Sequence, residues 1–502
     1  MSNDVVRNDL YGRLDIYASF ERITEDNVLD ELNSALSFHV RNMLQEEFLY
    51  WYRRGVQPIL NRTKGIRDDI LNKVQVNSAA EIVDFKNGFF NPSPEGACYV
   101  ARRSGVQRKV NRLNEYLYRS GKHDADNACA DWFHTVGKGV IYVEPNDDPD
   151  TPFRAYALDP RSAFVVYSLR PGNRPVMGVS MVTAEGRAYF DVFTENAVYR
   201  LSGTVVGDLM TAEKNHDFLA TASSLDSVEP NVLGHIPVIE YRYNSVNTSA
   251  FELAVPLLDE ISNLASNAVD GVEQFIQSLA VAVNCNIPPK TTISDIRKAG
   301  MIVMESVGEN KADFRILAEQ LDQTQTKVLM DSLREEVLRI CAMPNRSNGG
   351  STYDTTGAAI LASYGWYQAD CSRRNTEDLF RDSNRQFDRI ILDILRRKGL
   401  LDMDVNDFSL NFANGETTNV QAKAQAFQTL LAAGMHPELA AEKSGISSDP
   451  VKDMKLSEKW LEMIWGNPAK VLQAEQTNGG AGEARITESD ADNGETVTGG
   501  DV

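Results

Sequence analysis

Apolar residues recur at helical spacing in two long segments, residues 250–283 and 321–343. In the first segment they follow one another in steps of three or four, which predicts a helix that buries one stripe. In the second they recur every fourth residue until Pro344 ends the pattern. We expect the acids that lie off the first stripe to face solvent; they are Asp259, Glu260, Asp270 and Glu273.

A third helical segment, residues 358–397, contains no proline and only one glycine, Gly365. A helix of that extent would be ~60 Å long at about 1.5 Å per residue. Because few single domains can cover such a helix, we expect other copies of the chain to cover it. The residues before it, 345–357, are rich in Gly, Ser, Thr and Asn, which predicts a loop.

A compact insert, residues 284–320, separates the first two helical segments. It opens with Ile287-Pro288-Pro289. The pattern within it predicts a short helix near 292–299 and strands at 301–304 and 314–317. Two long helices therefore flank a small α/β insert.

The N-terminal half combines helices with a region of short strands. Helical spacing predicts helices within 24–60 and over 107–119. Aromatic residues between Phe48 and Tyr52 are interpreted as core, with binding of a planar ligand as the alternative. Short β-branched and aromatic runs predict a region of antiparallel strands. Its strands are expected at 140–143, 163–167, 177–182, 187–193, 197–201 and 236–241.

The C-terminal part begins with an alternating segment, 408–412, which predicts a strand. Residues 418–466 predict three helices, with breaks at Gly434 and Gly445. From Gln473 onward the chain holds almost no large apolar residues, so we expect a disordered acidic tail.

Composition narrows the class of protein. The 502 residues are 42% hydrophobic and 24% charged, which is ordinary for a folded protein. The formal charge of −20 argues against a broad basic face that grips nucleic acid, but it permits an acidic surface that nucleic acid passes without sticking. Five scattered cysteines indicate reduced thiols in a cytosolic setting. No run of 18 apolar residues predicts a membrane span, and the polar N-terminus does not resemble a secretion signal.

The chain lacks the common catalytic motifs. It contains no phosphate-binding GxxxxGK[ST], no HExxH, no GxSxG and no acidic Ca²⁺ loop. Gly349-Gly350 precedes a helix, but without a following lysine it is weak as a phosphate cradle. A metal site is conceivable from the side chains near residue 130, although their spacing matches no ligand pattern. These are His123, Asp124, Asp126, Cys129, Asp131 and His134.

The order of elements resembles the portal proteins of tailed bacteriophages, with most similarity to those of long-tailed phages of Gram-positive hosts. Four segments carry the resemblance: Val83 to Pro92 as an apolar segment before a turn, Tyr156 to Tyr167 as a proline-marked strand pair, Gly234 to Tyr241 as the strand before the first stem helix, and Asn348 to Ile360 as a tunnel loop and helix start. Each is weak alone; their order makes the match specific.

The resemblance implies an α+β portal fold assembled as a ring, typically of twelve subunits, around a channel for double-stranded DNA. It implies a terminase large subunit, a head–tail connector, and capsid and scaffolding proteins as partners, with no cofactor, metal or membrane. The protein would lie at the portal vertex of the virion, after assembly in the host cytoplasm. The corresponding regions are 1–249 (wing), 250–283 (first stem helix), 284–320 (clip), 321–344 (second stem helix), 345–357 (tunnel loop), 358–400 (wing and tunnel helix), 401–417 (return strand), 418–472 (crown) and 473–502 (tail).

Two sets of site residues follow from the resemblance. The tunnel loop would bring Arg346, Ser347, Asn348, Gly349, Gly350, Ser351, Thr352, Tyr353 and Asp354 to the DNA. In the clip, Lys298, Lys311 and Arg315 could dock a partner. A merely flexible loop is the alternative for the first set, and solvated side chains for the second. An intracellular self-associating scaffold without a DNA channel is the alternative function, and an enzyme with an unrecognised site is a third.

Overall fold

The computed structural model describes most of the chain. It covers residues 10, 12–64, 70–90, 97–103, 105–206, 219–276, 279–283, 285–286, 305–306, 313–317, 323–345, 365–412, 420–447, 450 and 453–457. The chain forms two units, residues 1–419 and 420–502, and combines helices with sheets in an α+β fold.

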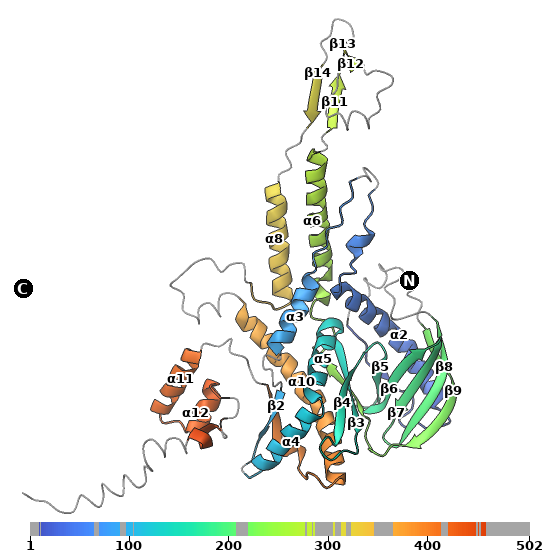
Figure 1. Cartoon of the computed structure of the whole chain (residues 1–502), viewed down its shortest axis with the longest axis vertical. Coiled ribbons are helices and arrows are strands. Elements are labelled where there is room, and N and C mark those ends of the chain that lie inside the picture. Colours follow the sequence, from blue (N-terminus) through green and yellow to red (C-terminus); the bar gives the residue numbers. More distant parts are fainter. Residues whose placement is uncertain are drawn as a thin grey trace, which may run out of the picture. The chain divides into compact units, whose positions relative to one another are not determined.

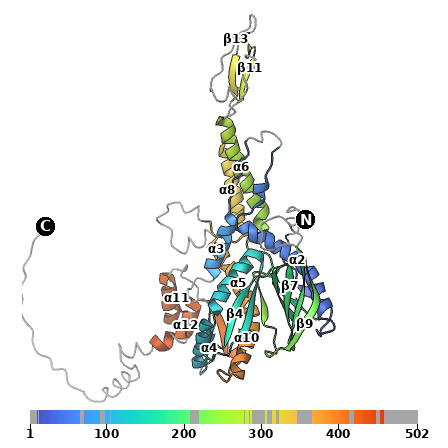
Figure 2. The same ribbon diagram turned by 45° about the vertical axis from the view of Figure 1, so that its right-hand side comes forward.

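A six-stranded sheet forms one layer of the first unit (Figure 1). Its order is β1-β5-β6-β7-β8-β9, with β1 parallel to β5 and every other pair antiparallel. The antiparallel pairing predicted for this region is observed, but the strands predicted at 140–143 and 236–241 belong to a second sheet. Helix α2, Val28–Arg53, packs on the sheet through Val28, Leu32 and Leu36 (Figure 2). The strands are β1 (Ile16–Tyr17), β5 (Ala163–Tyr167), β6 (Pro175–Ala184), β7 (Arg187–Phe193), β8 (Ala197–Val206) and β9 (Leu219–Pro230).

A second sheet of the first unit has the strand order β10-β3-β4. Helix α5, Lys122–Val136, packs closely on it, because a Cβ at Gly139 of β3 would lie only 2.5 Å from Cys129 Sγ. Helix α4 occupies Gln107–Arg119, the bounds predicted from its apolar spacing. The strands of this sheet are β3 (Lys138–Pro145), β4 (Phe153–Leu158) and β10 (Val238–Arg242). Strands β2 (Ala97–Ala101) and β15 (Phe408–Phe412) form a separate antiparallel pair.

The long helix predicted at 358–397 is observed as α10, Trp366–Arg397. Gly365 precedes it in the left-handed conformation, with φ of 79°, and residues 358–364 lie outside the described part. Its apolar face, including Phe380, Phe387 and Leu395, is buried against the second sheet and its neighbours. The expectation that only other copies could cover this helix is therefore wrong: its own chain buries one face along most of its length.

Two helices, α6 (Val255–Ile276) and α8 (Gln323–Ile340), pack side by side and form what we call the arm (Figures 1 and 2). The helix predicted to continue to residue 283 ends at Ile276. Residues Leu279–Val283 instead form β11, which pairs antiparallel with β14, Asp313–Leu317. The strand predicted at 314–317 is thus confirmed, while the segments 292–299 and 301–304 lie outside the described residues. A short pair, β12 (Cys285–Asn286) and β13 (Glu305–Ser306), completes this region.

The segment between α2 and α5 contains η1 (Pro58–Asn61) and α3 (Ser78–Phe90). Of the segment interpreted as apolar before a turn, Val83 to Pro92, residues 83–90 belong to α3 and residues 91–92 lie outside the described part. The second unit contains α11 (Val420–Ala432) and α12 (Pro437–Ser444), separated at Gly434, as predicted. Gly445 ends α12 in the left-handed conformation, and residues 453–457 are helical.

Candidate functional site: the arm and its base

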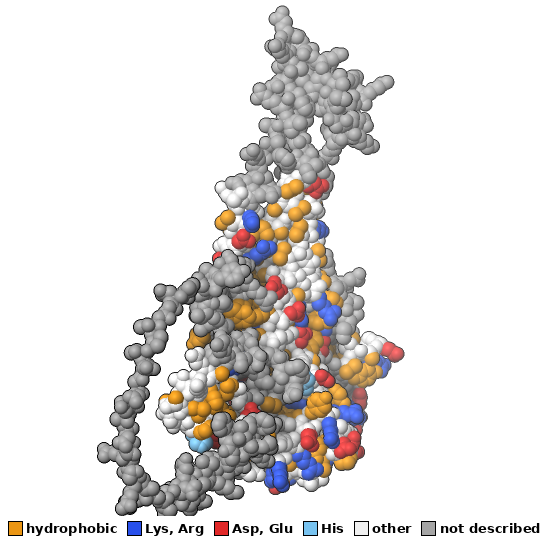
Figure 3. Space-filling view, turned by 60° about the vertical axis from the view of Figure 1, so that its left-hand side comes forward, with side chains coloured by type: hydrophobic (Ala, Val, Ile, Leu, Met, Phe, Trp, Pro, Cys, Tyr) orange, Lys and Arg blue, Asp and Glu red, His pale blue; other side chains and the backbone are white. Residues whose placement is uncertain are grey.

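Parts of the arm's surface are apolar and are not covered by the rest of the chain. Near its base, Ile261 of α6 and Val337 of α8 are buried in one cluster. Farther along, Val272 is 43% exposed and Val328 of α8 is 65% exposed. Figure 3 shows hydrophobic side chains on this part of the molecule among scattered charges. Exposed apolar patches of this kind mark surfaces for association.

An extended segment, residues 70–77, runs along α6 and is called the strap here. Its backbone amides donate to polar side chains of one helical face. Val76 N donates to Ser262 Oγ over 3.3 Å, Val74 N to Ser266 Oγ over 2.9 Å and Asn72 N to Asp270 Oδ1 over 2.8 Å. These three acceptors lie four residues apart, so successive helical turns hold successive strap residues.

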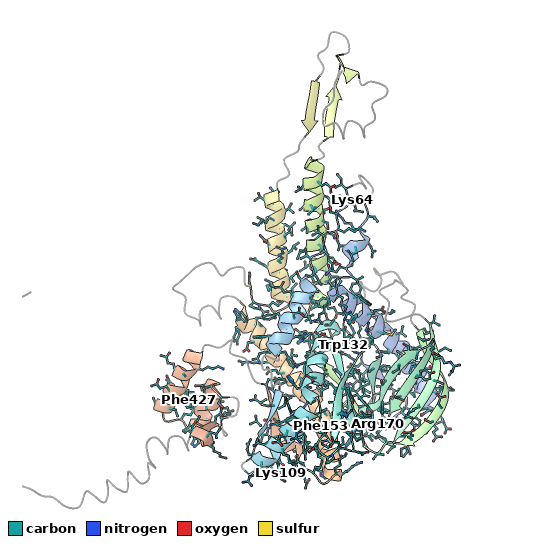
Figure 4. All side chains as sticks on the ribbon, in the orientation of Figure 1. Lys64, Lys109, Trp132, Phe153, Arg170 and Phe427 are labelled. Carbon is teal, nitrogen blue, oxygen red and sulfur yellow. The ribbon has the colours of Figure 1, made fainter. Side chains whose placement is uncertain are left out.

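Asp270 binds both the strap and two basic residues that precede it in the chain. Arg62 pairs with Oδ2 over 2.9 Å, Lys64 pairs with the same oxygen, and Asn72 donates to Oδ1. Figure 4 shows Lys64 beside α6. Burial acts to raise the pKa of Asp270, but the hydrogen bonds from Lys64 and Asn72 and the charge of Arg62 outweigh it and lower the pKa to about 2.

The expectation that the acids of this helix face solvent is wrong for two of them. Asp270 is buried beneath the strap, and Asp259 is buried where it accepts a hydrogen bond from Tyr52 OH over 2.9 Å. Glu260 is exposed, as predicted. The partners of Asp259 and Asp270 come from segments about 200 positions away in the sequence, so spacing within the helix could not reveal them.

A buried ion pair anchors the start of the arm. Glu252, in the short helix η2 (Glu252–Ala254) before α6, accepts from Arg13 Nη2 over 2.6 Å, and neither side chain is exposed. The same carboxylate accepts from the backbone amides of Gly12, over 3.0 Å, and Ser249, over 2.8 Å. These bonds satisfy the buried charge, which would otherwise be costly.

The end of α8 is held by a left-handed residue and a lysine. Ala342 has φ of 49°, and Met343 N donates to Leu338 O over 2.8 Å, the pattern of a Schellman motif. Lys86 of α3 donates from Nζ to Ala342 O over 3.2 Å and to Ser372 Oγ of α10 over 3.3 Å. Burial lowers the pKa of Lys86 to about 8. This lysine, which the sequence pattern did not single out, links α3, α8 and α10.

A cavity of about 650 Å³ lies at the base of the arm, between α8, α10 and the segment before α6. Amide and hydroxyl side chains provide most of its polar lining, and Leu253, Ile340 and Leu379 are among its apolar residues. Among the described residues that line it, Asp378 is the single carboxylate and none is a histidine. Burial raises the pKa of the neighbouring thiol, Cys341, to about 12, so this thiol is a poor nucleophile at neutral pH.

The predicted site residues fall largely outside the described part of the chain. This holds for Lys298, Lys311 and every loop residue from Arg346 to Asp354. Arg315 lies in β14 opposite Val281 of β11, and only its backbone is described. The flanks of the loop are informative: a Cβ at Gly365 would lie 3.5 Å from Met343 O and 3.8 Å from Pro344 Cα. The chain therefore returns beside the point at which it left.

Three of the acidic and histidine side chains of α5 contact other residues. Asp126 pairs with Lys122, Asp131 with Arg53 over 2.6 Å, and His134 bonds Asn87 over 2.6 Å. Within the residues that the structure covers, no three His, Cys, Asp or Glu side chains are grouped as metal ligands. None of the described helices has the length and apolar character needed to span a membrane.

The two-helix arm, the α10 helix and the sheets together make an α+β fold. A sequence model for "Phage portal protein, SPP1 Gp6-like" matches residues 43–464, which is most of the chain, and the chain therefore belongs to this family. No curated protein matches it. The family is structural, and its members are capsid-associated oligomers at a vertex of the virion through which phage DNA passes. The predicted resemblance to portal proteins is confirmed.

Proposed function

We propose that this chain forms a dodecameric ring at one capsid vertex, through which double-stranded DNA is packaged and later ejected. The family match over residues 43–464 carries this proposal. In the assembled ring, a terminase large subunit docks during packaging and a head–tail connector replaces it afterwards. Major capsid and scaffolding proteins are further partners, assembly takes place in the host cytoplasm, and the protein acts without catalysis. The host group named from the resemblance stays a prediction.

In this proposal α6 and α8 are the stem of the ring, and the strands between them belong to the clip. The exposed Val272 and Val328 support stem packing, because neighbouring copies would bury apolar surface that one chain leaves open. Lys298, Lys311 and Arg315 are the proposed docking residues of the clip. Helix α10 then connects the stem to the outer wing, and the second unit is the crown.

The segment from Arg346 to Asp354 is proposed as the tunnel loop. The proximity of Gly365 to Met343 supports this assignment, because a segment whose ends meet projects from one point of the ring. Arg346 and Asp354 are its only charged residues, so it would touch phosphates transiently. The charge of −20 suits a conduit that DNA passes without sticking.

Negative-stain electron microscopy of the purified protein tests the ring. We expect rings with an axial hole wide enough for B-DNA. A monodisperse monomer or dimer at every concentration, with scaffolding protein present as well, would contradict the proposal and favour a self-associating scaffold without a channel. Deletion of residues 347–352 tests the tunnel loop: rings are expected to persist while DNA packaging falls. Unchanged packaging by the deletion variant would remove the loop from the proposal.

A further inference from the structure

A basic stretch interrupts this acidic chain. Between Arg102 and Arg119 there are six bases and a single acid, Glu115, although the whole chain carries a charge of −20. The stretch begins where β2 ends and continues through α4. Figure 4 shows Lys109 on α4 at the edge of the first unit. None of the functions proposed above accounts for this concentration of positive charge.

The fold turns these bases to solvent. Helix α4 buries Val110, Leu113 and Leu117 against the core, so its opposite face is exposed. Arg108 and Arg112 lie one turn apart on that exposed side. The exposed bases Arg102, Arg108, Lys109 and Arg112 are called the basic face. Figure 3 shows Lys and Arg side chains gathered at the lower end of the body, where α4 lies in Figure 1, with some acids between them.

Acids of the chain do not neutralise the basic face. Arg103 and Arg119, two other bases of the same stretch, form pairs of 3.4 Å with Asp407 and Asp150 in which the arginines are exposed, and such pairs contribute little. Within the part of the chain that the structure describes, no member of the basic face has a carboxylate partner. Lys109 donates to the carbonyl oxygen of Asp402 over 2.7 Å, and Arg112 donates to Tyr116 OH over 3.0 Å.

The bases also do not serve the stability of α4. Arg108 and Lys109 occupy its first turn, which holds no acid and no side-chain cap. Cations at this end oppose the helix dipole, at a cost of roughly 0.3–1 kcal/mol each. Charges that destabilise their own helix are better explained by a binding partner outside the chain.

We propose that the basic face binds the phosphate backbone of double-stranded DNA. This inference rests on the proposed function, which brings DNA to the protein. Three of its four members are arginines, whose planar guanidinium groups bind phosphates with two hydrogen bonds. The chain also carries an acidic tail, residues 473–502, with seven acids and one base. A duplex carries one negative charge per about 1.7 Å and is far more densely charged, so DNA fits this face better.

Binding of labelled duplex DNA of about 30 base pairs to the full-length protein tests the inference. In about 50 mM salt, the triple variant Arg108→Gln, Lys109→Gln, Arg112→Gln is expected to bind at least tenfold more weakly. Its slope of log affinity against log salt should fall by about 2 to 3. The matched control removes three exposed arginines that have acidic partners, through Arg170→Gln, Arg200→Gln and Arg385→Gln. This control should change affinity less than about twofold.

Equal losses in both triple variants would overturn the inference, because general charge would then explain binding, and so would unchanged binding by the basic-face variant. A third outcome also overturns the inference. If deletion of residues 473–502 strengthens DNA binding by the native chain but not by the basic-face variant, the acidic tail is what occupies the basic face. Electron microscopy of the same samples separates the two proposals. Absent rings count against the portal ring, whereas rings without basic-face binding count against this inference alone.

Discussion

Lys86 Nζ donates a hydrogen bond to the carbonyl oxygen of Ala342 over 3.2 Å, so a buried side chain of α3 fixes the last turn of α8. The same amine bonds Ser372 of α10 over 3.3 Å. Lys86 thus links α8 of the arm to α10. Because Ala342 adopts a left-handed conformation that costs an alanine roughly 1–2 kcal/mol, this end of the helix depends on such external contacts.

Replacing Lys86 by methionine removes this link. We expect faster hydrogen exchange at the amides of Ala342 and Met343 at the end of α8, measured by mass spectrometry. Lys327→Met, a change at an exposed position of the same helix, is the control and should leave that exchange unchanged. Equal exchange in Lys86→Met and the native chain would show that Lys86 does not hold the helix end.

Lys86 also predicts a pH dependence of stability. Its pKa is lowered by burial from 10.5 to about 8, so the unfolded chain binds more protons than the folded chain between these values. The contribution of Lys86 to the free energy of unfolding therefore rises between pH 8 and 10.5, by up to about 3 kcal/mol. Urea unfolding should show this rise in the native chain relative to Lys86→Met. Parallel pH profiles of the two proteins would contradict it.

Glu46 of α2 predicts the opposite dependence. It is buried, its Oε2 atom has no hydrogen-bond partner among the described residues, and burial raises its pKa to about 8. The folded chain holds this proton between pH 4.5 and 8, while the unfolded chain releases it, so stability falls as pH rises through that window. Glu46→Gln should remove this loss, with a gain relative to the native chain that grows to at most on the order of 4 kcal/mol at pH 8.

The control for this change is Glu115→Gln, at an exposed position of α4. Its stability should differ from that of the native chain by a constant amount across the same pH range. A gain for Glu46→Gln that does not grow with pH would mean that Glu46 is ionised in the folded chain.

The strap should loosen when its main attachment is weakened. Asp270→Asn removes the charge that Arg62 and Lys64 bind, so the amides of Asn72, Val74 and Val76 are expected to exchange faster. Because the pKa of Asp270 is lowered to about 2, acid should have the same effect on the native chain: the stabilisation is present above pH 4 and is lost as pH falls through 2. Glu260→Gln on the same helix is the control, and a similar effect there would argue against a specific clamp.

The exposed apolar surface of the arm should matter for assembly more than for folding. Val328→Gln with Leu329→Gln replaces two exposed residues of α8 by a good helix former. Unfolding of the single chain should change by less than about 0.5 kcal/mol, as for other surface substitutions. Ring formation, followed by sedimentation velocity, should require at least tenfold more protein. Arg334→Gln on the same helix is the control, and unaltered assembly of the double variant would place the interface elsewhere.

The spacing of apolar residues predicted those elements whose own residues form a clear apolar face. Helix α4 has the predicted bounds because Val110, Leu113 and Leu117 give it a clear apolar face. Strand β9 was missed because most of its residues after Ala222 are exposed, so no apolar alternation indicates a strand. The end of α6 was placed too late because the apolar run Leu279–Val283 suits a helix and a strand equally.

Contacts between distant segments account for the other errors. Nothing near Asp270 in the sequence indicates that the strap covers it, and nothing in α10 indicates that the second sheet buries Phe380 and Phe387. The same limit applies to the candidate site. The loop at 345–357 stays a prediction from composition, because residues 346–357 lie outside the described residues. The link through Lys86 could not be predicted, because it depends on a helix about 250 positions earlier.

The proximity of Gly365 to Met343 and Pro344 also determines how the chain tolerates changes in length. Where two ends of a segment meet at a fixed point, adding residues between them leaves the anchoring helices in register. The entropy of closing the enlarged segment grows slowly, by about 0.6 kcal/mol for each doubling of its length. We therefore expect insertions between residues 346 and 364, such as a peptide tag, to leave α8 and α10 in place.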